Sequence, residues 1–196
     1  MTTTADVLIG APDRSTEEGV VGYAYTLPLA AVLPTDTTTA LAAAALDLGF
    51  VSEDGLAIAT DRSVEPIRDW NLDDVRMLLT EHNATLTFTI ISWTINGLKA
   101  FFGDENVTET STEIVVKVNA REIGNRAWVF NMKDGNRKRR VVVPNGAISS
   151  QGEITFVKGE QTPLEIELTA LVDDAGEKIY IYTAKGEDES GGGSDD

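Results

Sequence analysis

The sequence predicts a mainly β protein with one short flanking α-helix. Apolar and polar residues alternate along several runs in the middle of the chain, and residues that favour turns separate these runs. Only one segment has the clear spacing of an amphipathic helix. Hydrophobic residues make up 42% of the 196 residues, which is ordinary for a globular protein and too many for a disordered one.

The run at residues 84–91 has the clearest strand pattern. Its alternation puts three apolar side chains on one face: Leu86, Phe88 and Ile90. The opposite face carries Thr85, Thr87 and Thr89. This period of two predicts a strand with one buried and one wet face. Residues 163–169 and 178–183 alternate in the same way, and the turn residues at 173–176 between them predict a hairpin.

A second hairpin is expected from residues 127–132 and 140–144. The Asp-Gly-Asn sequence at residues 134–136 supplies residues that tolerate positive φ at its tip. Further strands are expected at residues 20–27, 56–60, 75–80, 114–120 and 153–157.

The helix is expected at residues 94–102. Its apolar residues fall on one face: Ile95, Leu98, Phe101 and Phe102. Gly103 follows as a C-terminal cap. Because the helix is short, we expect packing on the sheet to hold it. Residues 42–45 carry a weaker sign of a second helical turn.

Three parts of the chain differ in composition. Residues 1–45 are expected to form an N-terminal arm or extended segment, because the chain up to about Thr39 is rich in Thr, Pro and Ala. Residues 46–185 are expected to form a single β domain. Residues 186–196, rich in Gly, Ser and acidic residues, predict a flexible acidic tail.

The chain is strongly acidic, with 32 acidic and 16 basic residues and a net charge of −16. This balance argues against a general nucleic-acid binder and against docking on an anionic membrane. The chain has no cysteine, which excludes disulfides, thiolate nucleophiles and Cys-based zinc sites. The first residues lack the basic start of a signal peptide, and no apolar run reaches about 18 residues, so we expect no membrane anchoring.

The sequence predicts neither a catalytic centre nor a bound metal or cofactor. The single histidine, His82, lies between two strand signals and is interpreted as a turn residue rather than as part of a catalytic triad. Asp173, Asp174 and Glu177 cluster at a turn, but their spacing is not that of a calcium loop.

Tryptophans and a basic run are the candidate contact residues. Arg137, Lys138, Arg139 and Arg140 stand together in an acidic chain, and we expect them to pair with carboxylates of a neighbour rather than with nucleic acid. Alternation places Arg137 and Arg139 on one side of a strand and Lys138 and Arg140 on the other. Trp70, Trp93 and Trp128 lie near the ends of predicted elements, where they serve either as core residues or as interface anchors.

The order of motifs resembles the major tail tube protein of phages with long flexible tails, especially those of actinobacterial hosts. The resemblance spans roughly residues 46–183, and Ser92-Trp93 departs from it where we would expect a carboxylate. The motifs that carry it are residues 48–56, 64–70, 75–76, 80–83, the strand at 84–91, the helix ending at Phe102-Gly103, residues 139–146, residues 152–156 and the turn at 173–176.

This resemblance implies a β-sandwich or half-barrel subunit that joins edge to edge into hexameric rings. Stacked rings would form a tube that lets DNA pass without specific binding, and the N-terminal arm and a long loop would contact the next ring. The partners would be further copies and the tape measure, tail tip and terminator proteins, with assembly in the host cytoplasm and a place in the virion tail. The inter-subunit candidates are Trp70, Arg76, Trp93, Arg137, Lys138, Arg139 and Arg140.

The lumen would be lined by acidic and hydroxyl side chains of inner strands. An acidic wall repels DNA phosphates over a screening length of about 8 Å at physiological salt, so DNA filling the tube would not be gripped. Whether Thr85, Thr87 and Thr89 face the lumen is left open.

Other functions share the same pattern. A monomeric β-sandwich that binds or decorates would have the same strands but would not assemble. A tail terminator or neck protein would stop at one ring. An enzyme would need paired carboxylates in a pocket, because His and Cys are nearly absent.

Overall fold

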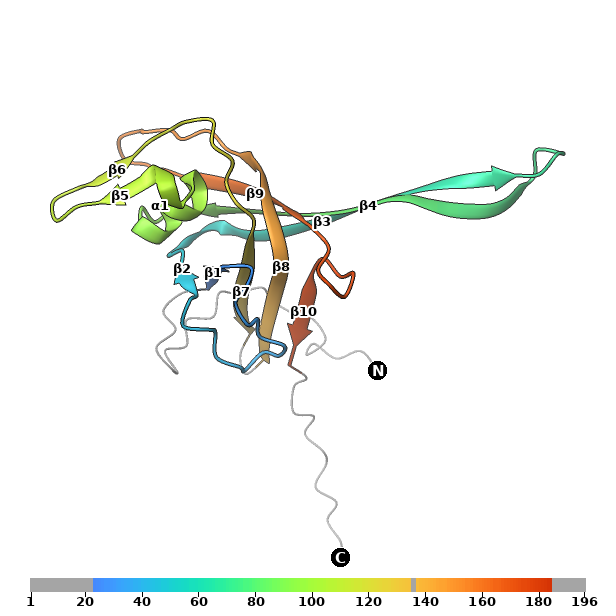
Figure 1. Ribbon diagram of the computed structural model, residues 1–196, viewed down its shortest axis with the longest axis horizontal. Helices are drawn as coiled ribbons and strands as arrows, with labels where there is room; N and C mark the ends of the chain where they lie inside the picture. Colours follow the sequence, from blue (N-terminus) through green and yellow to red (C-terminus); the bar gives the residue numbers. More distant parts are fainter. Residues whose placement is uncertain (1–22, 135–136, 185–196) are drawn as a thin grey trace, which may run out of the picture.

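The computed structural model describes residues 23–134 and 137–184, and ten strands and one α-helix account for most of their regular structure (Figure 1). In chain order the elements are β1 (Ala24–Leu27), β2 (Leu46–Asp47), β3 (Val51–Arg68), β4 (Asp74–Ile90), α1 (Ile95–Phe102), the 3-10 turn η2 (Asp104–Asn106), β5 (Val107–Glu109), β6 (Ile114–Val116), β7 (Arg126–Asp134), β8 (Arg137–Gln151), β9 (Leu164–Ala170) and β10 (Tyr180–Thr183).

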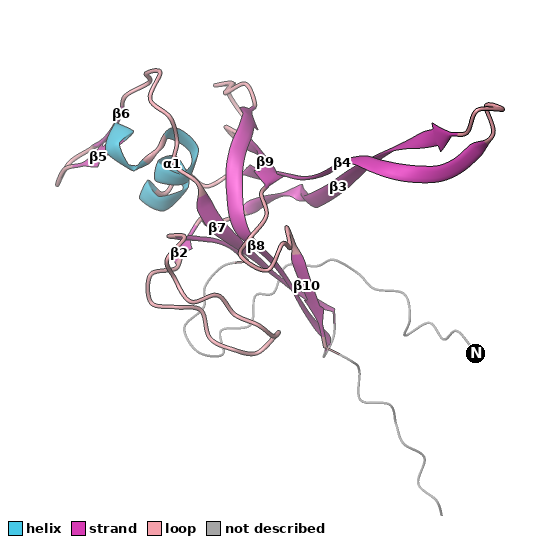
Figure 2. Ribbon diagram, turned by 45° about the vertical axis from the view of Figure 1, so that its right-hand side comes forward, coloured by secondary structure: helices cyan, strands magenta, loops and turns pink. Residues whose placement is uncertain are grey.

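Eight of the strands form one antiparallel sheet in the order β2-β1-β7-β8-β9-β4-β3, with β10 also paired to β8. Strand β8 joins two halves of this sheet. Its first part, Arg139–Val142, pairs with β10, whereas Gly146–Gln151 pairs with β9. Register irregularities lie where β8 passes from one set of neighbours to the other. Such irregularities bend and twist a strand, so the sheet folds over on itself (Figure 2).

The main core lies between the two halves of the sheet. The ring of Phe88 on β4 meets Trp128 and Phe130 on β7 edge to face, with centroids 5.8 and 5.0 Å apart. Because β4 and β7 are not neighbours in the sheet, these contacts join two facing layers. Leu98 and Phe101 of α1 are buried against the same cluster. The predicted mainly β sandwich with one short flanking helix is confirmed.

A second apolar cluster covers the outer face of β1, β7 and β8. Its buried members are Tyr25, Leu27, Ala127, Val129 and Val142. Residues from the segment between β1 and β2 pack on it, among them Leu33 and Leu41. Central strands buried on both faces lose the alternation of buried and exposed residues, and all four residues of β1 are buried, Thr26 among them.

The local predictions for residues 84–91, the helix and the second hairpin are confirmed. The seven residues from Ala84 to Ile90 alternate between buried and half-buried. Thr94 caps α1 by accepting a hydrogen bond from the Gly97 amide at 3.1 Å, and Gly103 ends it at φ 92°. Strands β7 and β8 pair as an antiparallel hairpin. Its predicted tip residues, Gly135 and Asn136, lie outside the described residues.

The first predicted hairpin is wrong in its pairing. Residues 164–170 and 180–183 are strands, and Gly176 at φ 84° closes the turn before β10. However, β9 pairs with β4 and β8, while β10 pairs with β8 and, among the described strands, with no other. The long β8 has two separate stretches along which another strand can pair. Strands β9 and β10 therefore pair with different stretches of β8 instead of pairing with each other.

Several element bounds also differ from the predictions. His82 is not in a turn, because it lies within β4 opposite Arg62, and the predicted strands at 75–80 and 84–91 are one strand. Residues 56–60 are part of the longer β3. The strand predicted at residues 153–157 is absent, because these residues have no regular structure. Of the strand predicted at residues 114–120, only Ile114–Val116 is a strand. Residues 42–45, where a helical turn was predicted, form a single turn closed by a hydrogen bond from the Ala45 amide to the Ala42 carbonyl oxygen. Residues 20–22 and the predicted acidic tail lie outside the described ranges.

The predicted domain boundaries stay predictions. Within the arm expected at residues 1–45, Ala24–Leu27 form β1 and lie fully within the sheet, between β2 and β7. Among the described residues, no helix is both long and apolar enough to cross a membrane.

Candidate assembly surfaces

The longest feature outside the core is the hairpin of β3 and β4. Only residues 85–90 of β4 pair with β9, whereas the whole length of β4 pairs with β3. Beyond the body, the hairpin extends as a two-stranded ribbon (Figure 1). Every residue from Asp74 to Asn83 is exposed. A two-stranded ribbon alone is marginally stable in water, so this projection calls for a partner surface.

Cross-strand pairing sorts the outer side chains of this hairpin onto two faces. Val64 lies opposite Leu79, and Pro66 lies opposite Met77. With Val75, two residues before Met77, they form what we call the apolar row: Val64, Pro66, Val75, Met77 and Leu79. The other face is mixed, since Glu65 lies opposite Leu78 and Ile67 lies opposite Arg76. The inter-subunit candidate Arg76 therefore lies exposed on the mixed face.

The tip of the hairpin is an ordered turn that displays two apolar side chains. The Asp69 carboxylate accepts hydrogen bonds from the amides of Asn71 and Asp73 at 2.8 and 2.9 Å. Trp70 is 100% exposed, so it is not a core residue. Leu72 is also exposed and has φ 68°, in the left-handed region that costs a residue with a Cβ roughly 1–2 kcal/mol.

The apolar area on this hairpin is large enough for an interface. The row and the two tip residues are each about half to fully exposed. Side chains of this size leave on the order of 800 Å² of apolar surface open to water, close to the area that each partner contributes to a stable complex. Met77 and Leu72 were not among the predicted contact residues. The apolar residues at positions 75, 77 and 79, in a strand with no buried face, were the sequence pattern that could have identified Met77.

A second surface covers the outer face of β4 and β9. Thr85, Thr87 and Thr89 lie opposite Thr169, Glu167 and Glu165, respectively. The Ser149 hydroxyl on β8 lies 3.3 Å from the Glu167 carboxylate. Ala57 and Ala59 of β3 continue the face beside Thr87 and Thr85. We call these residues the hydroxyl–acid face; all are small, hydroxylated or acidic.

The basic run does not act as one unit. Arg140 is only 7% exposed, and its guanidinium donates to Asn131 Oδ1 at 2.7 Å and to the carbonyl oxygens of Asp36 and Thr39 at 3.0 and 2.7 Å. It therefore fixes the segment between β1 and β2 to the sheet, a role that was not predicted. Lys138 lies directly opposite Lys133, so like charges face each other at this end of the hairpin.

An exposed aromatic pair lies beyond the body end of β4. Trp93 donates from Nε1 to the carbonyl oxygen of Thr162 at 3.1 Å, and its ring lies 5.6 Å from that of Phe156. Phe156 is 76% exposed, and Val157 beside it is also exposed. We call Trp93, Phe156 and Val157 the aromatic patch. Phe156 was predicted to lie in a strand and was missed as a surface residue.

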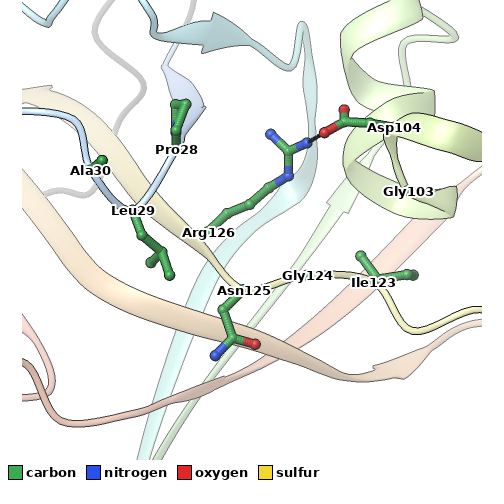
Figure 3. Close-up of a pocket in the computed structure, with 9 residues that line it drawn as sticks. All are labelled: Pro28, Leu29, Ala30, Gly103, Asp104, Ile123, Gly124, Asn125 and Arg126. Carbon is green, nitrogen blue, oxygen red and sulfur yellow. Dashed lines mark hydrogen bonds and ion pairs between the residues drawn. The ribbon is translucent and has the colours of Figure 1, made fainter.

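A pocket of about 430 Å³ lies between the end of β1, the end of α1 and the segment before β7 (Figure 3). Apolar side chains of Leu29 and Ile123 line it, and Arg126 pairs with Asp104 at its wall. Within the described residues, no group of three or more His, Asp or Glu side chains is placed to hold a metal ion. The pocket is not lined by His82, which is exposed on the β3–β4 hairpin.

The shifted carboxyl groups have structural causes. Hydrogen bonds from Thr39 and Thr38 hold the pKa of Asp36 far below its usual range, which stabilises the segment that Arg140 also holds. Burial raises the pKa of Asp47. The Tyr180 hydroxyl donates to Asp173 at 2.7 Å, which lowers the pKa of Asp173 and raises that of Tyr180 to about 12.

Comparison with known proteins gives one clear result. The family model described as phage tail tube protein matches residues 13–190. Among solved structures, the cryo-EM structure of the anti-feeding prophage cap (AFP tube terminating cap) matches with a TM-score of 0.43 and 14% identity, over 79% of this chain and 95% of that one. A likeness this distant supports no conclusion about function. No curated protein sequence matches the chain.

Proposed function

The chain belongs to the phage tail tube protein family, and from this premise we propose that it assembles into stacked, hexameric rings that form the channel for DNA in a phage tail. As a member of this family it is a structural component of the tail. The single observation that best supports self-assembly is the β3–β4 hairpin, whose apolar row and tip are uncovered in the isolated chain. We propose that copies of the same chain cover it.

The hydroxyl–acid face is our proposal for the channel wall. Its side chains offer DNA phosphates no cationic partner, and Glu165 and Glu167 repel them. A ring of six copies carries a formal charge of −96, six times −16. DNA could then move along the wall instead of binding to it. This function is mechanical, and no bond is made or broken in it.

The contact candidates take different roles in this proposal. Trp70 and Arg76 belong to the hairpin that reaches a neighbour, and Trp93 belongs to the aromatic patch. Arg137, Lys138 and Arg139 would meet carboxylates of a neighbouring copy, which would relieve the opposition of Lys133 and Lys138. From the order of the sequence motifs we further propose that the phage to which this protein belongs has a long flexible tail and infects an actinobacterial host.

Negative-stain electron microscopy at high protein concentration tests the assembly, with light scattering at low concentration beside it. We expect rings or hollow tubes from the wild-type chain. The double variant M77S/L79S should stay monomeric, because it places two hydroxyls in the apolar row. Val118→Ser is the matched control, since Val118 is exposed outside the hairpin. A wild-type chain that stays monomeric at every concentration and salt would contradict the proposal and favour a monomeric binding module.

DNA retention tests the channel wall. Tubes of the double variant E165K/E167K should retain DNA in a salt-dependent manner, because lysines on the wall would release counterions from the phosphates. Wild-type tubes and tubes of Glu122→Lys, which changes an exposed carboxylate outside the hydroxyl–acid face, should not. Equal retention by the two lysine variants would place the channel wall elsewhere.

A further inference from the structure

The chain carries two exposed apolar surfaces at opposite ends of one strand. The hairpin tip with Trp70 and Leu72 precedes β4, and Trp93 follows the last residue of β4, Ile90, by three positions. A strand of 17 residues spans about 55 Å. Two apolar surfaces this far apart along one extended strand cannot cover each other within a single chain.

We propose that the aromatic patch of one copy receives the hairpin tip of another copy. The proposal rests on the assembly proposed above and names the surface that the hairpin contacts. It commits to Trp70 and Leu72 on one side, and to Trp93, Phe156 and Val157 on the other.

Both surfaces are held in place before they meet. At the tip, the Asp69 carboxylate fixes the turn through two backbone amides. At the patch, the bond from Trp93 Nε1 to Thr162 ties the segment after β8 to the end of β4, and Phe156 packs against the Trp93 ring while most of it stays open. An ordered backbone turn and a packed ring pair lose less conformational freedom on contact than mobile segments would, which favours affinity. Aromatic residues in such positions dominate the energy of interfaces.

The geometry of this contact gives the assembly a direction. The two surfaces differ, so the contact is heterologous: each copy uses its tip on one neighbour and its patch on another. A heterologous contact that does not close continues without limit, as a tube requires. A contact between two tips would be symmetric and would end at pairs.

The absence of cysteine from the chain allows a clean cross-linking test. Leu72→Cys and Val157→Cys change exposed residues on the two surfaces. A short thiol-reactive cross-linker added to a mixture of the two single variants, under assembly conditions, should produce covalent dimers on a denaturing gel. The double variant L72C/V157C should give a ladder of trimers and longer multimers, because every chain then offers both ends of the contact.

The matched control uses Ile181→Cys in place of Val157→Cys. Ile181 lies on β10, outside the aromatic patch, and is about as exposed as Val157. The mixture of L72C and I181C should give no more dimer than either variant alone. Dimers from L72C alone would show a symmetric contact between tips and overturn the proposal. Preferential linking to Ile181→Cys would overturn it as well.

Electron microscopy of the same samples separates this proposal from the assembly itself. Tubes without the L72C–V157C link would overturn the proposed receptor and leave the assembly standing. If the samples show no tubes and no cross-links, both the assembly and the proposed contact are overturned. As a second measurement, Phe156→Ala should raise the protein concentration needed for assembly roughly tenfold or more. Val118→Ala should leave this concentration unchanged, and an equal effect of the two substitutions would count against the patch.

Discussion

The two halves of strand β4 both carry apolar residues but have different surroundings. From Ala84 to Ile90 the side chains alternate between buried and half-buried, and the buried ones fill the core. From Asp74 to Asn83 every residue is exposed, although apolar residues are frequent there too. The comparison teaches that apolar residues in a strand predict burial, but not whether the side chains are buried within the same chain or against another molecule. The body half finds its partners in its own chain, and we propose that the outer half finds them in another copy.

This difference decides which substitutions unfold the protein and which prevent assembly. A core side chain stabilises the isolated chain, so its loss appears in the free energy of unfolding. A side chain that is exposed in the isolated chain contributes little to that quantity, and surface substitutions usually stay within about 0.5 kcal/mol. The following predictions test this separation.

Phe88→Ala should have the largest effect on the isolated chain. Phe88 is 2% exposed and joins the two layers through Trp128 and Phe130, so its removal leaves a cavity in the core. We expect a loss of about 3–5 kcal/mol in the free energy of unfolding, measured by urea denaturation at a concentration where the protein is monomeric. Thr87→Ala, on the opposite face of the same strand, should cost less than about 1 kcal/mol. Equal losses would mean that the layers do not meet at Phe88.

Arg140→Ala should have the next largest effect. Its removal leaves Asn131 Oδ1 and two backbone carbonyl oxygens without the donor that they have now. We expect a loss of about 2–3 kcal/mol in the free energy of unfolding. Hydrogen exchange should show faster exchange in residues 28–45, the segment that Arg140 holds.

Lys138→Ala is the control for Arg140. Lys138 lies on the same strand and opposite Lys133, so its removal lifts a repulsion instead of breaking a buried contact. It should leave the stability of the isolated chain unchanged or slightly raised. Faster exchange in residues 28–45 of this variant would contradict the role given to Arg140.

More of the body than of the β3–β4 hairpin could be predicted from the sequence. Residues 84–90 alternate because one face meets the core, and this regularity shows in the sequence. The outer half of β4 has no such face, so its alternation is broken at Leu78 and Leu79, and it was predicted as a separate short strand. Asn83 and His82 look like turn residues in isolation, but pairing with Asp61 and Arg62 on β3 keeps them in the strand.

The candidate site was predicted in part for the same reason. Trp70 and Thr85, Thr87 and Thr89 stand out by residue type and alternation alone. Phe156 does not, because its exposure follows from how the segment after β8 packs on Trp93, far away in sequence. Arg140 was grouped with three neighbours of like charge, and only the fold reveals that the carbonyl oxygens of Asp36 and Thr39 lie within its reach.

A smaller effect is expected from the pair of Tyr180 and Asp173 at the edge of the body. The Tyr180 hydroxyl donates to the Asp173 carboxylate, so the folded state raises the pKa of Tyr180 to about 12 from its ordinary value of 10.0. The stabilisation from this bond is fully present below pH 10 and is lost as the pH rises through about 12. In Asp173→Asn, ultraviolet titration should show one phenol ionising at lower pH than in the wild type. Identical titration curves would argue against the bond.

The smallest effect on the isolated chain should come from Trp70→Ala, although it removes the largest exposed apolar side chain. Trp70 is fully exposed at a turn that Asp69 holds through backbone amides, so the substitution breaks no packing and no hydrogen bond of the isolated chain. We expect the free energy of unfolding to change by less than about 0.5 kcal/mol, measured by urea denaturation of the monomer beside Phe88→Ala. Assembly of the same variant should fail under conditions where the wild type forms tubes. A large loss of monomer stability would mean that the hairpin packs on its own body in solution, and the contrast between the two halves of β4 would then disappear.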